Sequence, residues 1–218
     1  MSVVQPVESE GVADRILGGL SRIALVLRHR GWMDATEFGI TPTQGQILAL
    51  LASRPQGPMG VSRIAMELAL TKPTVSDSIS TLVRKGLVEK VRSSSDRRAV
   101  ELRLTQRGGQ LAEGTSAWPD FLRSATQALS EEERAVFLRA LVKMLRALQG
   151  QGYIPVTRMC VNCRFFNPFT HADSERPHHC GFLDAPIGDR MLQVDCGDFD
   201  PSAEARREEV WISFARKD

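Results

Sequence analysis

The sequence lacks the features of a membrane or secreted protein. Its 218 residues contain no run of about 18 apolar residues, the length that a membrane-spanning helix needs. The N-terminal segment MSVVQPVESE has neither the basic start nor the apolar centre of a secretory signal peptide. These absences predict a cytoplasmic protein that does not associate with a membrane.

Recognisable catalytic motifs are also missing. The sequence has no glycine-rich phosphate loop, no HExxH motif, no serine nucleophile elbow and no His/Cys pair with an orienting acid. A single activated cysteine is a weak alternative, because the cysteines occur as a group. We therefore expect that the chain is not an enzyme.

Cysteine is absent from the first 159 residues and then occurs four times, at Cys160, Cys163, Cys180 and Cys196. In a reducing compartment, grouped thiols bind a metal more often than they form disulfides. Four thiolates can complete a tetrahedral site and leave no position open for catalysis. The spacing contains one Cys-x2-Cys pair, whereas a zinc ribbon usually has two, so an iron–sulfur cluster fits at least as well.

The residues around these cysteines favour a 4Fe-4S cluster, with Zn²⁺ as the alternative. Five of the nine phenylalanines lie within residues 160–199 and could keep a cluster away from water, namely Phe165, Phe166, Phe169, Phe182 and Phe199. The cysteine pattern loosely resembles that of small cluster-binding proteins related to high-potential iron–sulfur proteins. His171, His178 and His179 could replace a cysteine ligand or support one from behind. The same aromatic residues could equally form the core of a zinc module.

Charge is distributed unevenly along the chain, although the net charge is only +2. Residues 41–108 contain 11 Lys and Arg against 5 Asp and Glu, and residues 154–218 contain 8 against 11. Only the middle segment is basic enough to favour phosphates. A solvated basic surface explains the charge alone equally well.

Apolar spacing and capping signals predict the order of the elements. Helices are expected at residues 12–30, from 42 onward, and at 61–68, 72–84, 105–129 and 130–148, strands at 88–91 and 99–104, and an amphiphilic segment at 202–214. Thr41 is the expected N-cap of the second helix, with Gln44 placed to complete a capping box. Ser130 and Glu133 have the same spacing. Pro119 is expected to kink the helix over 105–129.

The helix over residues 72–84 has a polar face opposite its apolar one. Its outward-facing positions combine small and charged residues that suit a DNA groove: Lys72, Pro73, Thr74, Ser76, Asp77, Ser80, Thr81 and Arg84. Lys and Arg suit phosphates, and Ser and Thr suit phosphates or base edges. Asp77 could accept a hydrogen bond from a cytosine amino group. An ordinary exposed helix surface is the alternative interpretation.

The hairpin that follows this helix has a basic tip. Arg92, Arg97 and Arg98 lie at a turn that could enter a narrow minor groove, and Asp96 could brace the turn by local hydrogen bonds. Three helices followed by a hairpin form a winged helix-turn-helix. Helix and tip together are therefore a more specific signal for DNA binding than either alone.

Five segments of this region resemble the multiple-antibiotic-resistance regulator (MarR) family of winged-helix transcription factors: residues 41–44, 70–75, 82–88, 95–100 and 104–108. The resemblance implies a homodimer paired through its first and last two helices, with two recognition helices in a pseudo-palindromic DNA site. It also implies repression that a signal relieves. Asp96 and Arg98 match the wing pair of the family. Asp77 stands where many members have a basic residue, which bears on the preferred DNA sequence.

The expected fold class is mostly α with a small β wing. Gly150, Gly152 and Pro155 mark a domain boundary. Residues 1–152 are predicted to form the DNA-binding and dimerisation domain, with the winged-helix core at about residues 41–108. Residues 153–218 are predicted to form a small, loop-rich module that a metal holds together.

The predicted function is that of a DNA-binding transcriptional regulator, most simply a repressor. The four-cysteine centre would modulate DNA binding in response to redox state, oxygen or iron. A MarR-type regulator that responds to a small aromatic ligand and carries a structural zinc module is one alternative. An iron–sulfur electron-transfer protein with a winged helix as its interaction module is another. The expected partners are double-stranded DNA, a second copy of the chain and a small-molecule inducer.

Overall fold

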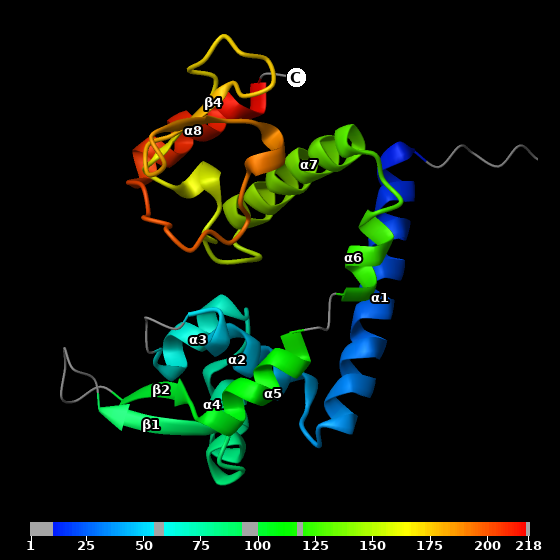
Figure 1. Cartoon of the computed structure of the whole chain (residues 1–218), viewed down its shortest axis with the longest axis vertical. Helices are drawn as coiled ribbons and strands as arrows, with labels where there is room; N and C mark the ends of the chain where they lie inside the picture. The colour runs from blue at the N-terminus through cyan, green and yellow to red at the C-terminus, as the bar shows by residue number, and fades with distance from the viewer. Residues whose placement is uncertain (1–10, 55–58, 93–99, 117–119, 217–218) are drawn as a thin grey trace, which may run out of the picture. The chain divides into compact units, whose positions relative to one another are not determined.

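A computed structural model of the chain describes residues 11–54, 59–92, 100–116 and 120–216 (Figure 1). It forms two compact units, Met1–Phe121 and Leu122–Asp218. The division falls before the predicted boundary at 152/153, because helix α7 (Glu131–Gly150) packs on the C-terminal segment. No helix in the described ranges is long and apolar enough to cross a membrane.

The first unit contains the three helices and the hairpin that the sequence predicts. Its elements are α1 (Val12–Glu37), α2 (Pro42–Ala52), α3 (Val61–Glu67), α4 (Lys72–Arg84), β1 (Val88–Arg92), β2 (Val100–Leu104) and α5 (Gln106–Ser116). The capping box of α2 is confirmed, because Thr41 Oγ1 accepts from the Gln44 backbone N–H and Gln44 Oε1 accepts from the Thr41 N–H. Helix α1 continues beyond the predicted end at Arg30 to Glu37.

The core of the first unit lies between α2, α3, α4 and the hairpin. Ile47 and Leu48 of α2 and Leu82 of α4 are fully buried, and Leu102 of β2 packs in the same cluster. Val75, Ile79 and Leu82 are the buried positions of α4. Their spacing leaves the opposite side of α4 facing outward, as the sequence predicts.

Two glycines allow the tight connections around the hairpin. Gly86 has a φ of +68° and ends α4 in the left-handed conformation that favours glycine. A Cβ on Gly108 would lie 1.9 Å from the Leu87 carbonyl oxygen, so only glycine fits at the start of α5. Strands β1 and β2 are antiparallel, with Val88 opposite Leu104. The first turn of α5 therefore packs closely against the base of the wing.

The second unit combines helices with a small antiparallel sheet. Its elements are α7, η1 (Cys160–Asn162), β3 (Phe166–Asn167), β4 (His178–Cys180), β5 (Ala185–Ile187), η2 (Asp189–Met191) and α8 (Glu204–Arg216), and α6 (Asp120–Thr126) spans the division between the units. The sheet has the order β3-β4-β5 and was not predicted. The single helix predicted over 105–129 contains two helices, α5 and α6, and Pro119 lies outside the described residues. The capping box of Ser130 and Glu133 at α7 is confirmed.

The second unit has its own core. Val142 of α7 and Val210 and Phe214 of α8 are buried together with Phe166 of β3 and Ile187 of β5. Because helices from both ends of the segment pack in the same core as the sheet residues, the elements and loops that carry the cysteines lie on a compact support.

Candidate nucleic-acid interface and cysteine cluster

The N-terminal half of α4 presents polar side chains to solvent. Thr71 caps the helix, and its Oγ1 accepts a hydrogen bond from the Thr74 N–H at 3.3 Å. The predicted DNA-contacting residues of α4 are exposed, apart from Thr81, which is half-buried; the exposed ones are Lys72, Pro73, Thr74, Ser76, Asp77, Ser80 and Arg84. The structure therefore brings these residues together on one outward face.

Some of these side chains form hydrogen bonds within α4, whereas others have no partner in the described structure. Ser80 Oγ donates to the Ser76 carbonyl at 2.9 Å, and Arg84 Nη2 donates to Thr81 Oγ1 at 3.4 Å. Among the described residues, Lys72 and Asp77 have no hydrogen-bond or ion-pair partner for their side chains. Both can therefore bind DNA without breaking a contact of the fold.

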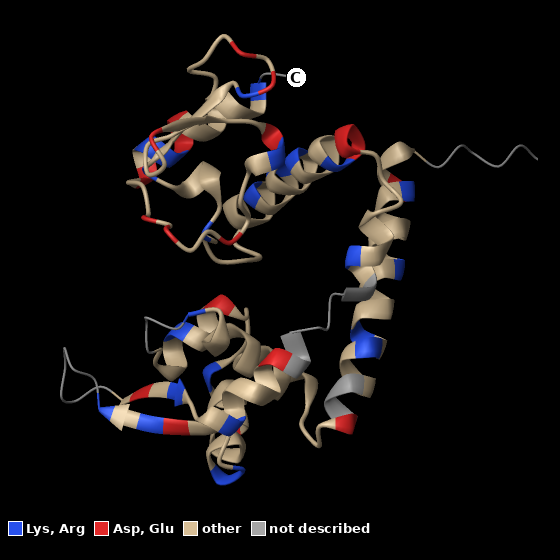
Figure 2. Ribbon diagram, in the orientation of Figure 1, with Lys and Arg blue, Asp and Glu red and all other residues tan. Residues whose placement is uncertain are grey.

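The wing extends from the same unit. Arg92 is exposed at the end of β1. Strand β1 carries the cations Lys90 and Arg92 together with the carboxylate of Glu89, so blue and red alternate along it (Figure 2). The remaining predicted wing residues, Asp96, Arg97 and Arg98, lie outside the described residues.

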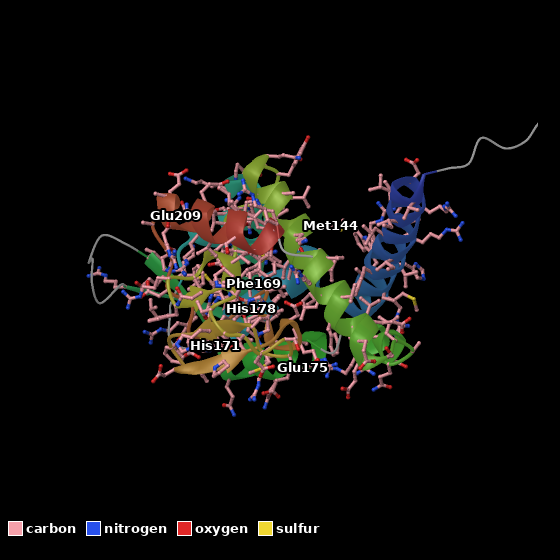
Figure 3. The ribbon with its side chains drawn as sticks, turned by 90° about the horizontal axis from the view of Figure 1, so that it is seen from above. Met144, Phe169, His171, Glu175, His178 and Glu209 are labelled. Carbon is pink, nitrogen blue, oxygen red and sulfur yellow. The ribbon has the colours of Figure 1, made fainter. Side chains whose placement is uncertain are left out.

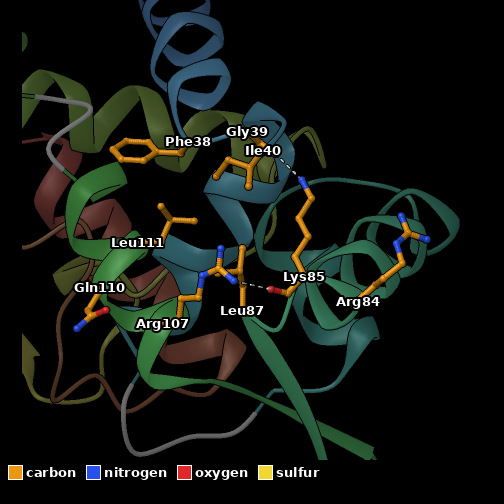
Figure 4. Close-up of a pocket in the computed structure, with 9 residues that line it drawn as sticks. All are labelled: Phe38, Gly39, Ile40, Arg84, Lys85, Leu87, Arg107, Gln110 and Leu111. Atoms are coloured by element: carbon orange, nitrogen blue, oxygen red, sulfur yellow. Dashed lines mark hydrogen bonds between the residues drawn. The ribbon is translucent and has the colours of Figure 1, made fainter.

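A pocket of about 660 Å³ lies beside the C-terminal end of α4 (Figure 4). Phe38, Ile40, Leu87 and Leu111 provide its apolar side chains, and the other lining residues are Gly39, Arg84, Lys85, Arg107 and Gln110. Lys85 Nζ donates to the Gly39 carbonyl, and Arg107 Nη1 donates to the Lys85 carbonyl at 3.5 Å. The pocket thus combines an apolar lining with cationic side chains.

The four cysteines are brought together in the second unit. The Cys163 N–H donates to the Cys160 carbonyl at 2.9 Å, and the Cys196 N–H donates to the carbonyl of Arg158, two residues before Cys160. Cys180 pairs with Phe166 across β3 and β4. All four cysteines are free thiols, and Cys163 is buried.

The other three cysteines lie close enough to Cys160 to affect the pKa of its thiol. Burial is the main reason that the pKa of Cys160 is raised to about 11. The Gln193 N–H, which donates to Cys160 Sγ at 3.2 Å, opposes this rise, while Cys196, Cys180 and Cys163 add to it. Within the part of the chain that the structure describes, no group of three or more His, Cys, Asp or Glu residues is arranged so that it could hold a metal ion. The thiols are therefore neighbours without forming a closed ligand set.

The three histidines near the cysteines have other partners. His178 is fully buried, and its Nε2 and Nδ1 atoms lie 3.0 Å from Asp189 Oδ1 and 3.3 Å from the Phe169 backbone nitrogen (Figure 3). His171 Nε2 lies 3.2 Å from His179 Nδ1. Because side chains alternate along a strand, His178 shares the face of β4 with Cys180, and His179 lies on the opposite face.

Asp189 and Arg139 belong to this site but were not predicted from the sequence. Burial by itself raises the pKa of Asp189, but the hydrogen bond from His178 and the charge of Arg139 outweigh it, so that this pKa is lowered. Arg139 Nη1 lies 3.3 Å from Asp189 Oδ2. The two residues are far apart in sequence, and no local pattern connects them.

Comparison with known proteins relates the first unit to DNA-binding regulators. Residues 38–99 match the model of the MarR family. The regulator MgrA of Staphylococcus aureus is 30% identical over 105 residues, which cover 48% of this chain and 71% of MgrA. YsmB of Bacillus subtilis, an uncharacterised HTH-type transcriptional regulator, is 29% identical over 136 residues, which cover 62% of this chain and 91% of YsmB.

Solved structures of two regulators share the winged-helix fold over about 60% of this chain. The S. aureus MepR–DNA complex has a TM-score of 0.54 and 30% identity, and the match covers 60% of this chain and 94% of MepR. FabT of Streptococcus pneumoniae, also in complex with DNA, has a TM-score of 0.57 and 25% identity, with 64% of this chain and 99% of FabT covered. The relatives are regulators, in agreement with the expectation that the chain is not an enzyme.

Proposed function

This chain belongs to the MarR family of winged-helix, DNA-binding transcriptional regulators, and we propose that it is a homodimeric repressor controlled by a C-terminal four-cysteine centre. The observation that carries the DNA-binding part is the outward polar face of α4, which a β hairpin with exposed Lys90 and Arg92 follows in the chain. Helix α4 would enter the major groove and the wing arginines the adjacent minor groove.

Exposed apolar side chains support dimerisation. On α1, Val12, Ile16 and Leu17 are 68%, 51% and 58% exposed. On α7, Val136 and Phe137 are 71% and 43% exposed. Several large apolar side chains exposed on one helix usually mark an interface. A second copy of the chain is the proposed occupant, which would present two α4 helices to a two-fold symmetric DNA site.

The four cysteines would supply the ligands of a metal centre, a 4Fe-4S cluster by preference or Zn²⁺ as the alternative, although their thiols are not arranged around a metal in the described part of the chain. Cys163, Cys180 and Cys196 lie close enough to Cys160 to raise the pKa of its thiol, and the Gln193 N–H donates to its sulfur, as donors do at metal-bound thiolates. Phe166 is buried and Phe165 half-buried beside the thiols, whereas Phe182 is 52% exposed, so the shielding is partial. A cluster would make the centre sensitive to redox state, oxygen or iron, whereas Zn²⁺ would supply stability.

Helix α7 connects the four-cysteine segment to the proposed dimer surface. Arg146 Nη2 donates to Glu208 of α8 at 2.8 Å, and the Gln149 amide donates to Thr157 at 2.7 Å. One side of α7 therefore contacts the cysteine-bearing segment while the other carries the proposed dimer surface. Freeing the thiols would loosen the segment, shift α7 and change the separation of the two recognition helices.

Two measurements test this function. Protein purified without oxygen is expected to be brown, with an absorption band near roughly 400 nm from an iron–sulfur cluster. A colourless protein with bound zinc would instead favour Zn²⁺ as the metal. Binding to DNA from the region upstream of its own gene is expected to weaken steeply with salt, by a log–log slope of about −0.9 per phosphate contact. If a variant with all four cysteines replaced by serine binds this DNA unchanged, with and without oxygen, the control function fails and the module is structural.

The pocket beside α4 favours a second mode of control, in which a small aromatic acid relieves repression and the metal only stabilises. A volume of about 660 Å³ lies within the range of small-molecule sites. Phe38 could contact an aromatic ring, and Arg107 could bind a carboxylate. Millimolar benzoate, used as a probe, should then release DNA from the wild type but not from Arg107→Met. Unchanged DNA binding of the wild type in benzoate would count against this mode.

A further inference from the structure

A mostly buried chain of three side chains joins strand β4 to helix α7. His178 Nε2 lies 3.0 Å from one carboxylate oxygen of Asp189, and Arg139 donates to the other oxygen at 3.3 Å. His178 is fully buried, and the side chains of Arg139 and Asp189 are 18% and 26% exposed. We propose that Asp189 is a positioning residue that transmits the ligation state of Cys180 to α7, a role that rests on the proposed metal control.

The hydrogen bonds of His178 determine which of its ring nitrogens accepts and which donates. The Phe169 backbone N–H donates to His178 Nδ1 at 3.3 Å, so Nδ1 carries no proton. With Nδ1 accepting, Nε2 is the ring nitrogen that donates to Asp189 Oδ1. Both ring nitrogens are occupied, and His178 holds its position behind Cys180 instead of acting as a metal ligand.

Aromatic rings pack tightly around this chain. The His178 ring centroid lies 4.8 Å from that of Phe169 and 5.7 Å from that of Phe214, and Figure 3 labels Phe169 and His178 close together. The Arg139 guanidinium lies over the same two rings, at 5.6 and 5.2 Å from their centroids. The imidazole and the guanidinium thus share two aromatic neighbours, and neither can move without disturbing the other's packing.

Strand β4 connects this chain to the thiols. His178 is two residues from Cys180, on the same face of a strand of only three residues. Both neighbouring strands pair with β4, at Phe166↔Cys180 and at His178↔Ile187, and Asp189 follows β5 after a single residue. A displacement of Cys180 on ligation therefore moves His178, and the bond to Asp189 carries the displacement to Arg139 on α7.

A second contact between η2 and α7 provides a matched control. Arg190, the residue after Asp189, donates to Glu131 and Glu132 at the start of α7, each at 3.3 Å. These three side chains are 48%, 72% and 75% exposed. Ion pairs this exposed are screened by water and contribute little. Replacing Arg190 breaks a link between the same two elements without touching the buried chain.

The experiment compares full-length wild type with Asp189→Asn, Arg139→Met and the control Arg190→Ala. Zn²⁺ is the probe, because four thiolates take it up without a redox step. Three quantities are measured with and without Zn²⁺: zinc bound per chain, hydrogen exchange of the α7 amides, and affinity for the upstream DNA fragment. In the wild type and in Arg190→Ala, Zn²⁺ should slow α7 exchange and change DNA affinity by about tenfold. In Asp189→Asn and Arg139→Met, zinc uptake should persist while both responses are lost.

The results separate this inference from the function on which it rests. If Zn²⁺ leaves the DNA affinity of the wild type unchanged, the proposed control of DNA binding by metal is wrong. Hydrogen exchange of the α7 amides still decides the role of Asp189 in that case. Protection of α7 by Zn²⁺ that survives Asp189→Asn would overturn the inference. Loss of zinc uptake in both variants would overturn it too, because the chain would then assemble the site instead of transmitting its state.

Discussion

Replacing Asp77 by alanine tests whether α4 reads DNA bases. Asp77 is exposed and has no side-chain partner among the described residues, so its loss breaks no contact of the fold. A lost hydrogen bond to a cytosine amino group should cost about 1–3 kcal/mol, or roughly 5- to 150-fold in affinity for the specific site. Affinity for unrelated DNA should instead rise slightly, because a negative charge is removed from a surface that faces phosphates.

Fluorescence anisotropy with a specific duplex and a scrambled duplex, at one salt concentration, measures both effects. Glu37→Ala is the matched control, because Glu37 is an exposed carboxylate at the end of α1 and its removal changes the net charge equally. The ratio of specific to scrambled affinity should fall in Asp77→Ala and stay constant in Glu37→Ala. An equal gain in affinity for both duplexes in Asp77→Ala would refute base reading by Asp77.

Three further predictions concern phosphate contact, packing and metal uptake. Lys72→Ala should weaken binding to all DNA sequences alike and reduce the salt slope by about 1 in an anisotropy titration, and a loss confined to the specific duplex would contradict a phosphate contact. Gly108→Ala, whose Cβ would lie 1.9 Å from the Leu87 carbonyl oxygen, should lower unfolding stability in urea by about 1–3 kcal/mol or more, whereas Gly109→Ala, with nothing within 4 Å, should not. Because burial raises the pKa of Cys160 to about 11, its thiol is protonated in the metal-free protein at neutral pH. Zn²⁺ binding should therefore release protons and strengthen as the pH rises toward that value, and calorimetry in buffers of different ionisation enthalpy that shows no proton release would contradict this.

The same raised pKa has a consequence for stability without metal. The unfolded thiol ionises near its ordinary value of 9.0, below the folded value. The contribution of Cys160 to stability is therefore fully present below that ordinary value and is lost as the pH rises through about 11.

The elements that the sequence predicts well are those defined by local chemistry. Thr41 with Gln44 and Ser130 with Glu133 start their helices through side chains three residues apart, so a short window of sequence contains the whole signal. The outward face of α4 is predictable for the same reason, because Val75 defines the buried side together with residues one and two turns later.

The sheet of the second unit depends on pairing between distant residues. Strands of two or three residues are too short to show an alternating pattern, and the register of Phe166 with Cys180 exists only in the folded chain. The Arg139–Asp189–His178 chain is likewise non-local. The packing of α7 also depends on residues that are distant in sequence. Val142 packs on the C-terminal core, although the glycines after α7 suggest a domain boundary between them.

Control of DNA binding by the four-cysteine centre is tested most directly by the DNA affinity of one preparation, measured with its metal in place and again after chelation, at constant salt and protein concentration. We predict a change of about fivefold or more, within the usual range for coupling between two sites. A variant in which Cys163 is replaced by serine should show no such change. Equal affinity before and after metal removal in the wild type would contradict control by the four-cysteine centre.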